Sequence, residues 1–361
     1  MTAYVILILF IFLWRGVTLI ESDRKKANEY FLSGVFIYLY IFCVIRSFDI
    51  GRDIPGYING YNHVANMAWN DWEMFHFEIG YIFLMKICNL IGLSVRGFFY
   101  VVYFIILYPI YYLFKTESPR PLITVLVFIC FQYFVFDLSG LRQAMASSLC
   151  FLAFMVSLKK GKKYLLWFAI LVTCASLLHK SALAFAITYS VVRLPLNKKT
   201  IIIYIVLAII CFIINIAGVG AILSYYGSTT YEYSTDESQQ LGGTLIFVIL
   251  FAFLGILLSW YSSPDAKEKK QISIYTLMTI TGICAMFLAN GSVLLRATMY
   301  FYFPIMLIPA YLSERSIFGL GRIIKIALMV VLLTHFFISE INSFDVSPYE
   351  IGKDQYIFRN E

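Results

Sequence analysis

The chain has 361 residues, of which 61% are hydrophobic and only 14% are charged, and its mean hydropathy is +0.80. A water-soluble globular domain is about half apolar and about a quarter charged, so this composition excludes that class and indicates an integral membrane protein. The formal net charge of +7 does not indicate nucleic-acid binding, because the basic residues cluster in short loops between apolar segments, where they orient a membrane protein.

Apolar segments long enough for a helix to cross about 30 Å of hydrocarbon recur along the whole chain. They lie at 2–20, 29–45, 97–114, 122–136, 141–158, 164–178, 181–194, 200–217, 244–261, 271–289, 296–312 and 322–338. Lipid cannot satisfy open backbone groups, so unbroken apolar runs favour helices. We therefore expect an all-α, polytopic fold with about 12 transmembrane helices, forming a single transmembrane domain over residues 1–361.

Loop charges predict which helix ends face the cytoplasm. The basic stretches are 23–26, 159–163, 197–199, 267–270 and the pair Arg322 and Lys325. Residues 46–77 and 218–243 are predicted to be outer loops, and residues 339–361 an extracytoplasmic tail. If every apolar segment between residues 46 and 160, including 77–92, crosses the membrane in turn, the basic stretches 23–26 and 159–163 fall on opposite sides of it. All basic stretches lie in the cytoplasm if the short segment 77–92 is re-entrant, entering the membrane from the outside and returning to the same side. The alternative is that one of the other segments is not a span.

Under this topology the polar residues that interrupt the apolar pattern gather at the extracytoplasmic ends of their helices. They are Asp49, Arg52, Asp53, Tyr57, Glu78, Arg142, Gln143, His179, Lys180 and Arg296. Charges within a membrane are costly and by default mark a functional cavity. Each also has a structural interpretation: Arg142 snorkels to the headgroups, His179 with Lys180 anchors an interface, and the loop charges are simply solvated.

The residue types in this set favour binding of an anionic group. Guanidinium forks match phosphate oxygens in bidentate geometry, and a diphosphate-linked lipid is the expected ligand. A histidine such as His179, or a carboxylate such as Asp53 or Glu78, suits proton transfer from an attacking hydroxyl. The aromatic residues in and beside the first outer loop are expected to stack on sugar rings or to form an interfacial belt; they are Tyr57, Tyr61, Trp69, Trp72 and Tyr81.

Five short stretches carry a resemblance to a known family. "GRDIPGYINGY", "FEIGY", "SGLRQAMA", "HKSAL" and "RATMYF" follow one another between residues 46 and 303. In this order they resemble the EpsG family, polytopic membrane proteins of bacterial exopolysaccharide and capsule clusters that are described as Wzy-like polysaccharide polymerases. The most specific part is "SGLRQAMA" followed by "HKSAL". The chain departs from the family pattern at Ile54, where a small polar residue is expected.

The resemblance implies an enzyme that transfers a growing glycan from undecaprenyl diphosphate to an acceptor repeat unit. The reaction would occur at the extracytoplasmic face of the bacterial cytoplasmic membrane and would form exopolysaccharide, capsule or O-antigen. Arg142 and Arg296, assisted by Arg52, would bind the diphosphate; His179 or Asp53 would activate the hydroxyl. Gln143 and Lys180 would orient sugar or phosphate.

The implied partners are the lipid bilayer, the undecaprenyl-diphosphate-linked oligosaccharide, and a chain-length regulator and a flippase of the same pathway. No metal or other cofactor is expected, because arginines would neutralise the diphosphate and the chain has no DxD motif.

Four other functions compete with a polymerase. A GT-C type glycosyltransferase that uses a polyprenyl-phosphate sugar would share the many spans and a GT-C-like architecture, and Asp49 with Asp53 resembles its acidic pair in the first outer loop. A lipid-linked oligosaccharide flippase would carry charges along its whole path and show related halves, which the sequence lacks. A membrane acyltransferase and a purely structural subunit are the remaining alternatives.

Overall fold

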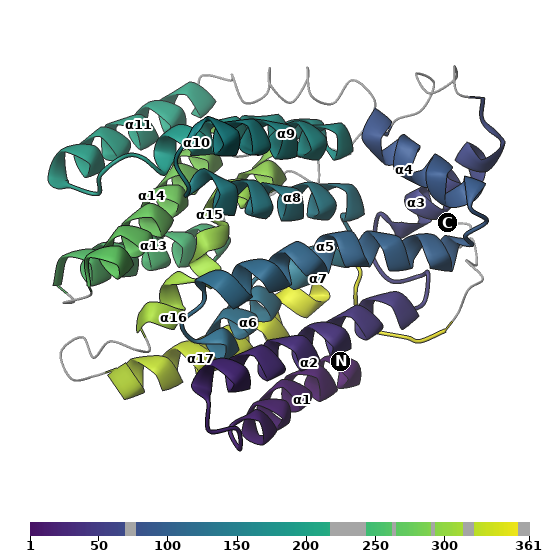
Figure 1. Cartoon of the computed structure of the whole chain (residues 1–361), viewed down its shortest axis with the longest axis horizontal. Helices are drawn as coiled ribbons and strands as arrows, with labels where there is room; N and C mark the ends of the chain where they lie inside the picture. Colours follow the sequence, from purple (N-terminus) through teal and green to yellow (C-terminus); the bar gives the residue numbers. More distant parts are fainter. Residues whose placement is uncertain (69–76, 217–242, 262–264, 290–292, 313–320, 353–361) are drawn as a thin grey trace. The chain divides into compact units, whose positions relative to one another are not determined.

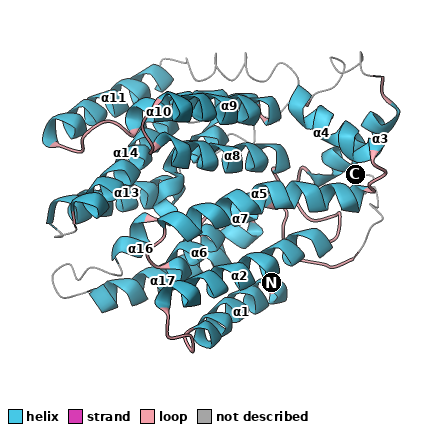
Figure 2. Ribbon diagram, viewed as in Figure 1, coloured by secondary structure: helices cyan, strands magenta, loops and turns pink. Residues whose placement is uncertain are grey.

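The computed structural model describes residues 1–68, 77–216, 243–261, 265–289, 293–312 and 321–352 (Figure 1). These residues are almost entirely helical and contain no β-strand, as the all-α prediction requires (Figure 2). Trp69, Trp72 and all but the last residue of the predicted outer loop 218–243 lie outside the described residues, as do residues 353–361 of the predicted tail.

The chain divides into two compact units. Unit 1 comprises Met1–Leu152, Cys174–Lys180 and Lys325–Glu361, and unit 2 comprises Ala153–Thr173 and Ser181–Ile324. The expectation of one transmembrane domain over residues 1–361 stays a prediction.

Unit 1 is built around two long antiparallel helices, α2 and α5. Its elements are α1 (Thr2–Thr18), α2 (Arg24–Ile45), α3 (Ile54–Asn66), α4 (Ile79–Leu90), α5 (Val95–Glu117), α6 (Pro121–Cys130), α7 (Tyr133–Asp137), the start of α8 (Leu141–Ser157), the end of α9 (Lys162–Leu178), most of α17 (Gly321–Ile338), and η7 (Glu340–Asn342). Asp23 starts α2 by accepting hydrogen bonds from the first backbone amides, and Ser94 does the same for α5. Helix α2 packs against both α1 and α5.

Unit 2 is built around α14. Its elements are the end of α8, the start of α9, most of η2 (Lys180–Ile187), α10 (Thr188–Val191), α11 (Lys198–Ile216), α13 (Gly243–Tyr261), α14 (Ala266–Ala289), η4 (Val293–Thr298), α15 (Met299–Tyr302), η5 (Phe303–Met306), α16 (Ile308–Leu312) and the start of α17. Helix α14 packs against both α11 and α13. Gly282 allows α14 to approach α15 closely, since a Cβ there would lie 2.7 Å from the Cβ of Tyr302.

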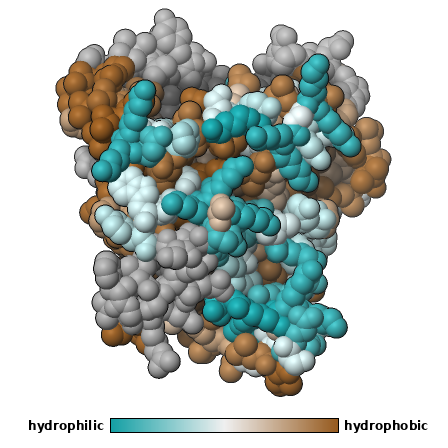
Figure 3. Space-filling view, turned by 60° about the vertical axis from the view of Figure 1, so that its left-hand side comes forward, coloured by the Kyte–Doolittle hydropathy of each residue, from teal (hydrophilic) through white to brown (hydrophobic). Residues whose placement is uncertain are grey.

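Five described helices, α2, α5, α11, α13 and α14, are long and apolar enough to cross a membrane. On α11 the apolar side chains point outward: Ile202 is 61% exposed and Ile213 is 58% exposed. A helix that is apolar all round and largely unburied is stable in hydrocarbon, not in water. Figure 3 shows hydrophobic side chains exposed around the hydrophilic ones in the middle of that view. The chain is therefore an integral membrane protein.

Three expected spans are not single helices. Segment 122–136 is divided between α6 and α7 at Gln132, whose φ is +52°. Segment 181–194 forms the 3-10 helix η2 and the single turn α10, and segment 296–312 is divided among η4, α15, η5 and α16. Proline at the start of η5 contributes to the last break, because Pro304 has no backbone N–H to continue a helix. The count of about 12 continuous spans is thus not reproduced among the described residues.

Helix α4 has the length expected of a segment that does not cross the membrane. Its 12 residues rise about 18 Å, less than the thickness of the hydrocarbon core. Its polar side chains serve the end of α3: Lys86 Nζ donates to the carbonyls of Val64 and Met67, and Asn89 Nδ2 donates to that of Tyr61 at 3.2 Å. They satisfy the open carbonyls of a helix C-terminus.

Candidate functional site

A polar cluster centred on Glu78 lies within unit 1. Glu78 precedes α4, Arg142 is the second residue of α8, and His179 follows the last turn of α9. Arg142 Nη1 lies 2.5 Å from Glu78 Oε2, and His179 Nδ1 lies 3.1 Å from Oε1. The backbone N–H of Lys180 donates to Oε1 at 3.2 Å. The Glu78 carboxylate therefore accepts hydrogen bonds from Arg142, His179 and Lys180. We call these four residues the Glu78 cluster.

The cluster is shielded but not closed. The side chains of Glu78 and Arg142 are 10% and 15% exposed, whereas that of His179 is 28% exposed. Charge-assisted hydrogen bonds of this kind are about twice as strong as neutral ones, and more so where water is partly excluded. Of the three side chains that meet in the cluster, that of His179 is thus the most open to a substrate.

Two aromatic rings hold the Arg142 guanidinium. Its Cζ lies 4.6 Å from the ring centroid of Phe77 and 5.9 Å from that of Tyr57. Tyr81 packs against both rings, with centroid distances of 5.3 Å to Phe77 and 5.6 Å to Tyr57. The Nε of Arg142 is buried and makes no hydrogen bond among the described residues. A buried donor without a partner costs about 1–3 kcal/mol, which an anionic ligand would recover.

Gly80 explains how Glu78 reaches His179. A Cβ at position 80 would lie 2.7 Å from the carbonyl oxygen of Leu177 and 2.8 Å from its Cβ. Because these atoms belong to the last turn of α9, only glycine lets α4 approach that turn so closely. The glycine of "FEIGY" therefore sets the distance between the carboxylate and the imidazole.

Gly80→Ala is expected to separate Glu78 from His179 and to reduce activity nearly as much as removing the carboxylate. A shift of about 1 Å at a catalytic group can cost on the order of 100-fold. The measurement is the size distribution of the surface glycan that the family resemblance implies, at equal membrane levels of protein. The control is Gly56→Ala in α3, where a Cβ would meet nothing within 4 Å. Equal behaviour of the two variants would contradict the role of the close approach.

Electrostatics keep Glu78 ionised. This residue lies outside the five membrane-spanning helices. Burial by itself would raise its pKa, but the hydrogen bond from His179 and the charges of Arg142 and His179 outweigh burial and lower the pKa from 4.5 to about 2. A carboxylate that is so hard to protonate is a poor base near neutral pH, so Glu78 suits a positioning role.

The lowered pKa of Glu78 predicts an acid-dependent loss of stability. A group with a lower pKa in the folded state contributes its stability fully above the unfolded value of 4.5, and loses it as pH falls towards 2. The contribution is on the order of 3 kcal/mol. We expect the gap in Tm between wild type and Glu78→Gln to narrow on acidification from about pH 5 to about pH 3. A gap that does not change with pH would refute this linkage.

The Glu78 contact also fixes the chemistry of the His179 ring. A carboxylate only accepts hydrogen bonds, so the 3.1 Å contact requires the proton on Nδ1. In the neutral ring this leaves the lone pair on Nε2. The same arrangement orients the catalytic histidine in acid–base triads.

The loop after α2 contacts the turn that leads to Arg142. The backbone N–H of Asp53 donates to Ser139 Oγ at 3.3 Å. Gly51, at φ +98°, lies so close to the Leu138 carbonyl that a Cβ would be 2.5 Å from that oxygen. Arg46, which is fully buried, donates to the same carbonyl and to Tyr103 Oη. These contacts join "GRDIPGY" to "SGLRQ".

The other predicted site residues are placed as follows. Asp49 is exposed and accepts from Ser47 Oγ at 3.2 Å, and Arg52 pairs with Asp345 at 3.1 Å. The side chain of Asp53 is half-buried, Gln143 is buried, and Lys180 is exposed and joins the Glu78 cluster through its backbone alone. Arg296 lies in η4 of unit 2 and is half-buried.

The segment after α17 forms a part of unit 1 for which the sequence suggested no role. The backbone N–H groups of Gly51 and Arg52 donate to the carbonyls of Asp345 and Phe344 at 2.9 and 3.0 Å. Ser47 N–H donates to Glu350 at 2.9 Å, and an isolated β-bridge joins Arg46 to Ile351. Residues 344–351 thus fix the backbone of the loop that leads to Tyr57.

Three contributors to the site were missed by sequence reasoning: Phe77, Gly80 and Arg46. Phe77 and Gly80 lie in "FEIGY", the motif that contains Glu78. Their roles depend on tertiary packing, which the sequence does not show. Arg46 ends a long apolar run, as Arg142 begins one. That shared position was the available signal for Arg46.

Comparison with known proteins gives one positive result. A sequence model described as the EpsG family matches residues 29–351. The match begins within α2 and ends at Ile351, and so includes all of the Glu78 cluster. No curated protein and no solved structure matches the chain.

Proposed function

The chain belongs to the EpsG family of polysaccharide polymerase-like membrane proteins, and from this premise we propose that it polymerises lipid-linked oligosaccharide repeat units. It would transfer the growing glycan from undecaprenyl diphosphate to the acceptor repeat unit at the extracytoplasmic face of the bacterial cytoplasmic membrane. A flippase that supplies repeat units and a chain-length regulator are its expected partners. The observation that carries the proposal is the Glu78 cluster, in which an arginine whose Nε has no partner among the described residues lies close to an oriented histidine.

In the proposed reaction the acceptor hydroxyl attacks the anomeric carbon of the growing glycan. His179 Nε2 takes the hydroxyl proton as the new glycosidic bond forms. The bond between the anomeric carbon and the diphosphate oxygen breaks, and undecaprenyl diphosphate leaves with the electron pair. Arg142 stabilises the negative charge that develops on the leaving oxygen, and such stabilisation accelerates the step when it is stronger in the transition state.

Glu78 has a positioning role in this proposal. It accepts a hydrogen bond from His179 Nδ1 and so fixes the ring with its proton on that nitrogen. It also binds Arg142 through Nη1, which leaves Arg142 Nε for the diphosphate. The rings of Phe77 and Tyr57 keep the guanidinium plane fixed, which reduces the entropy lost when the substrate binds. Arg296, Arg52, Gln143, Lys180, Asp53 and Asp49 remain proposed contacts to sugar or phosphate.

The proposed topology agrees with the position of the cluster along α8 and α9. Arg142 begins α8 and His179 follows α9, whereas the basic loop 159–163 joins the other ends of these two helices. Each helix has 17 residues and rises about 25 Å. With the basic loop in the cytoplasm, the cluster lies towards the extracytoplasmic side.

The test is complementation of a strain whose own polymerase gene is deleted. Expression of the chain is expected to restore a ladder of glycan sizes on the cell surface. Single repeat units alone would mean that the chain does not polymerise. A chain that instead restores surface display of single repeats in a strain lacking a flippase would be a transporter. Incorporation of a sugar from a polyprenyl monophosphate donor would favour the GT-C type glycosyltransferase.

A further inference from the structure

Three arginines from separate elements meet at one end of unit 1. Arg15 lies in the last turn of α1, Arg24 is the first residue of α2, and Arg120 directly precedes α6. The basic stretch 23–26 predicts that this end faces the cytoplasm, whereas the Glu78 cluster is predicted to lie on the extracytoplasmic side. We call these three residues the arginine cluster.

One face of α2 provides the contacts that bring the arginines together. Arg24, Asn28 and Phe31 are spaced by four and seven positions, which places them on the same face of the helix. Arg15 Nη1 donates to Asn28 Oδ1 at 3.0 Å, and its Cζ lies 5.3 Å from the ring centroid of Phe31. Arg24 Nη2 donates at 3.5 Å to the carbonyl of Pro119, which immediately precedes the third arginine. The three basic residues are therefore neighbours in space.

Arg15 carries a positive charge that no described residue neutralises. Its side chain contacts Asn28 and Phe31 and forms no ion pair within the described part of the chain, where its Nε and Nη2 also have no acceptor. The charges of Arg24 and Arg120 repel it. Because Arg15 is half-buried, water screens this repulsion only in part, and an anion bound between the arginines would offset it.

The wider surroundings of the arginine cluster are also positive. Residues 15–29 and 115–120 contain six basic and four acidic side chains. Two of the acidic ones already have partners: Asp23 caps the start of α2, and Glu29 pairs with Lys115 at 3.7 Å. This end of unit 1 therefore attracts anions.

The arginine cluster adjoins apolar surface. Leu19 lies four positions after Arg15, and so beside it on the helix surface, and is 63% exposed; Leu13 on the outer side of α1 is 71% exposed. Guanidinium groups bind phosphate oxygens through paired donors, and exposed leucines next to them offer a surface for acyl chains. A soluble phosphate would gain nothing from that surface, whereas a phospholipid would bury it.

We propose that the arginine cluster binds the phosphate of an anionic phospholipid, whose acyl chains lie along α1. This site is separate from the Glu78 cluster and goes beyond the proposed function, on which it does not depend. The bound phosphate would lie between the end of α1, the start of α2 and the start of α6, and would hold these three helix ends together. Basic groups at a cytoplasmic membrane surface recognise anionic headgroups in this way.

The test is native mass spectrometry of the full-length protein in detergent, with dioleoyl phosphatidylglycerol and dioleoyl phosphatidylethanolamine as probes. We expect phosphatidylglycerol to bind about tenfold more tightly than the zwitterionic lipid. Arg15→Gln removes the charge that has no ion-pair partner among the described residues, and should remove most of this preference. Arg24→Gln should weaken it as well; because Arg24 is exposed, this variant tests the site without changing the core.

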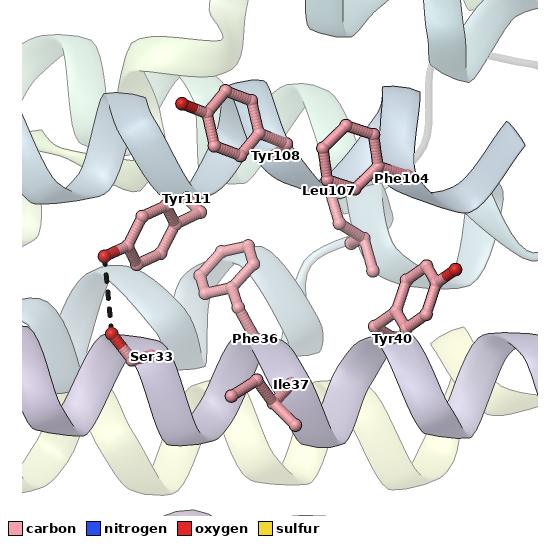
Figure 4. Close-up of a pocket in the computed structure, with 8 residues that line it drawn as sticks. All are labelled: Ser33, Phe36, Ile37, Tyr40, Phe104, Leu107, Tyr108 and Tyr111. Carbon is pink, nitrogen blue, oxygen red and sulfur yellow. Dashed lines mark hydrogen bonds between the residues drawn. The ribbon is translucent and has the colours of Figure 1, made fainter. Parts of the chain in front are cut away.

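Lys26→Gln is the matched control. It removes one positive charge from the same end of α2, but Lys26 is two positions from Arg24 and so lies on the opposite side of the helix. That side continues to Ser33, Ile37 and Tyr40, which face α5 across an apolar groove (Figure 4). Lys26→Gln should therefore keep the preference for phosphatidylglycerol.

Each outcome decides the proposal. Equal binding of the two lipids, or an equal loss in Arg15→Gln and Lys26→Gln, would overturn it. Displacement of phosphatidylglycerol by millimolar inorganic phosphate would show that the arginines bind a soluble anion, and would overturn the lipid site. Lipid binding that depends on Arg15 and Arg24 in a chain that restores no glycan ladder would support this site and refute polymerisation.

Discussion

Arg142→Ala is expected to collapse the surface glycan from a size ladder to single repeat units. Removing one preorganised charge that stabilises a transition state costs on the order of 100- to 1,000-fold in rate. In this protein the loss would also remove a charged partner of the Glu78 carboxylate, which keeps its contacts to His179 and to the Lys180 amide. The measurement is electrophoresis of the surface glycan at equal, verified membrane levels of the two proteins.

Two further variants make the Arg142 result specific. Arg142→Lys keeps the positive charge but loses the planar fork and its stacking on Phe77, so we expect partial activity at best. Arg193→Ala removes an exposed arginine beside the basic loop at 197–199 and should leave the ladder intact. A normal ladder from Arg142→Ala would refute the proposed role of this arginine.

His179→Ala is expected to reduce polymerisation by on the order of 100- to 10,000-fold, the usual range for a general base. Glu78→Gln should be nearly as harmful, because the amide presents N–H groups to Arg142 and no longer holds the imidazole as a carboxylate does. The measurement is the rate of chain growth from purified lipid-linked repeat units in nanodiscs.

A double-mutant cycle separates the positioning role of Glu78 from an independent one. If Glu78 acts through His179, adding Glu78→Gln to His179→Ala should cost little more than His179→Ala alone. Fully additive losses would show that Glu78 contributes separately, for example by contacting substrate. A histidine variant with wild-type kinetics would transfer the role of base to Asp53.

Several features were predictable from the sequence because they depend on local composition. The low charge and long apolar runs identify the surrounding solvent as lipid, and lipid permits few folds other than helices. The bounds of α2, α5, α11, α13 and α14 each differ by no more than five residues from the expected spans, because the apolar runs end at charged or polar residues. The family resemblance, carried by five short motifs, is also confirmed.

The interruption of three expected spans was not predictable from composition. Residues 122–136 are apolar except for Thr124, Gln132 and the hydroxyl of Tyr133, yet the backbone takes a positive φ at Gln132. Contacts with neighbouring helices determine where a helix can be interrupted, because groups within the protein can hydrogen-bond to the freed backbone groups and lipid cannot. Likewise, Lys86 and Asn89 look like cavity residues in sequence, but they serve carbonyls of α3 that only the folded chain brings near.

By itself, the sequence determined the membrane environment, the all-helical class, the family, and the residue types from which a site would be built. Only the tertiary structure decided that Glu78 is the shared acceptor of Arg142 and His179, that Gly80 sets their spacing, and that residues 344–351 fix the loop before Tyr57. The physical reason is that hydropathy acts on each segment separately. Hydrogen bonds and close packing join residues that are far apart in the chain, 342 positions in the case of Tyr4 and Val346, and no local pattern records which pairs will meet.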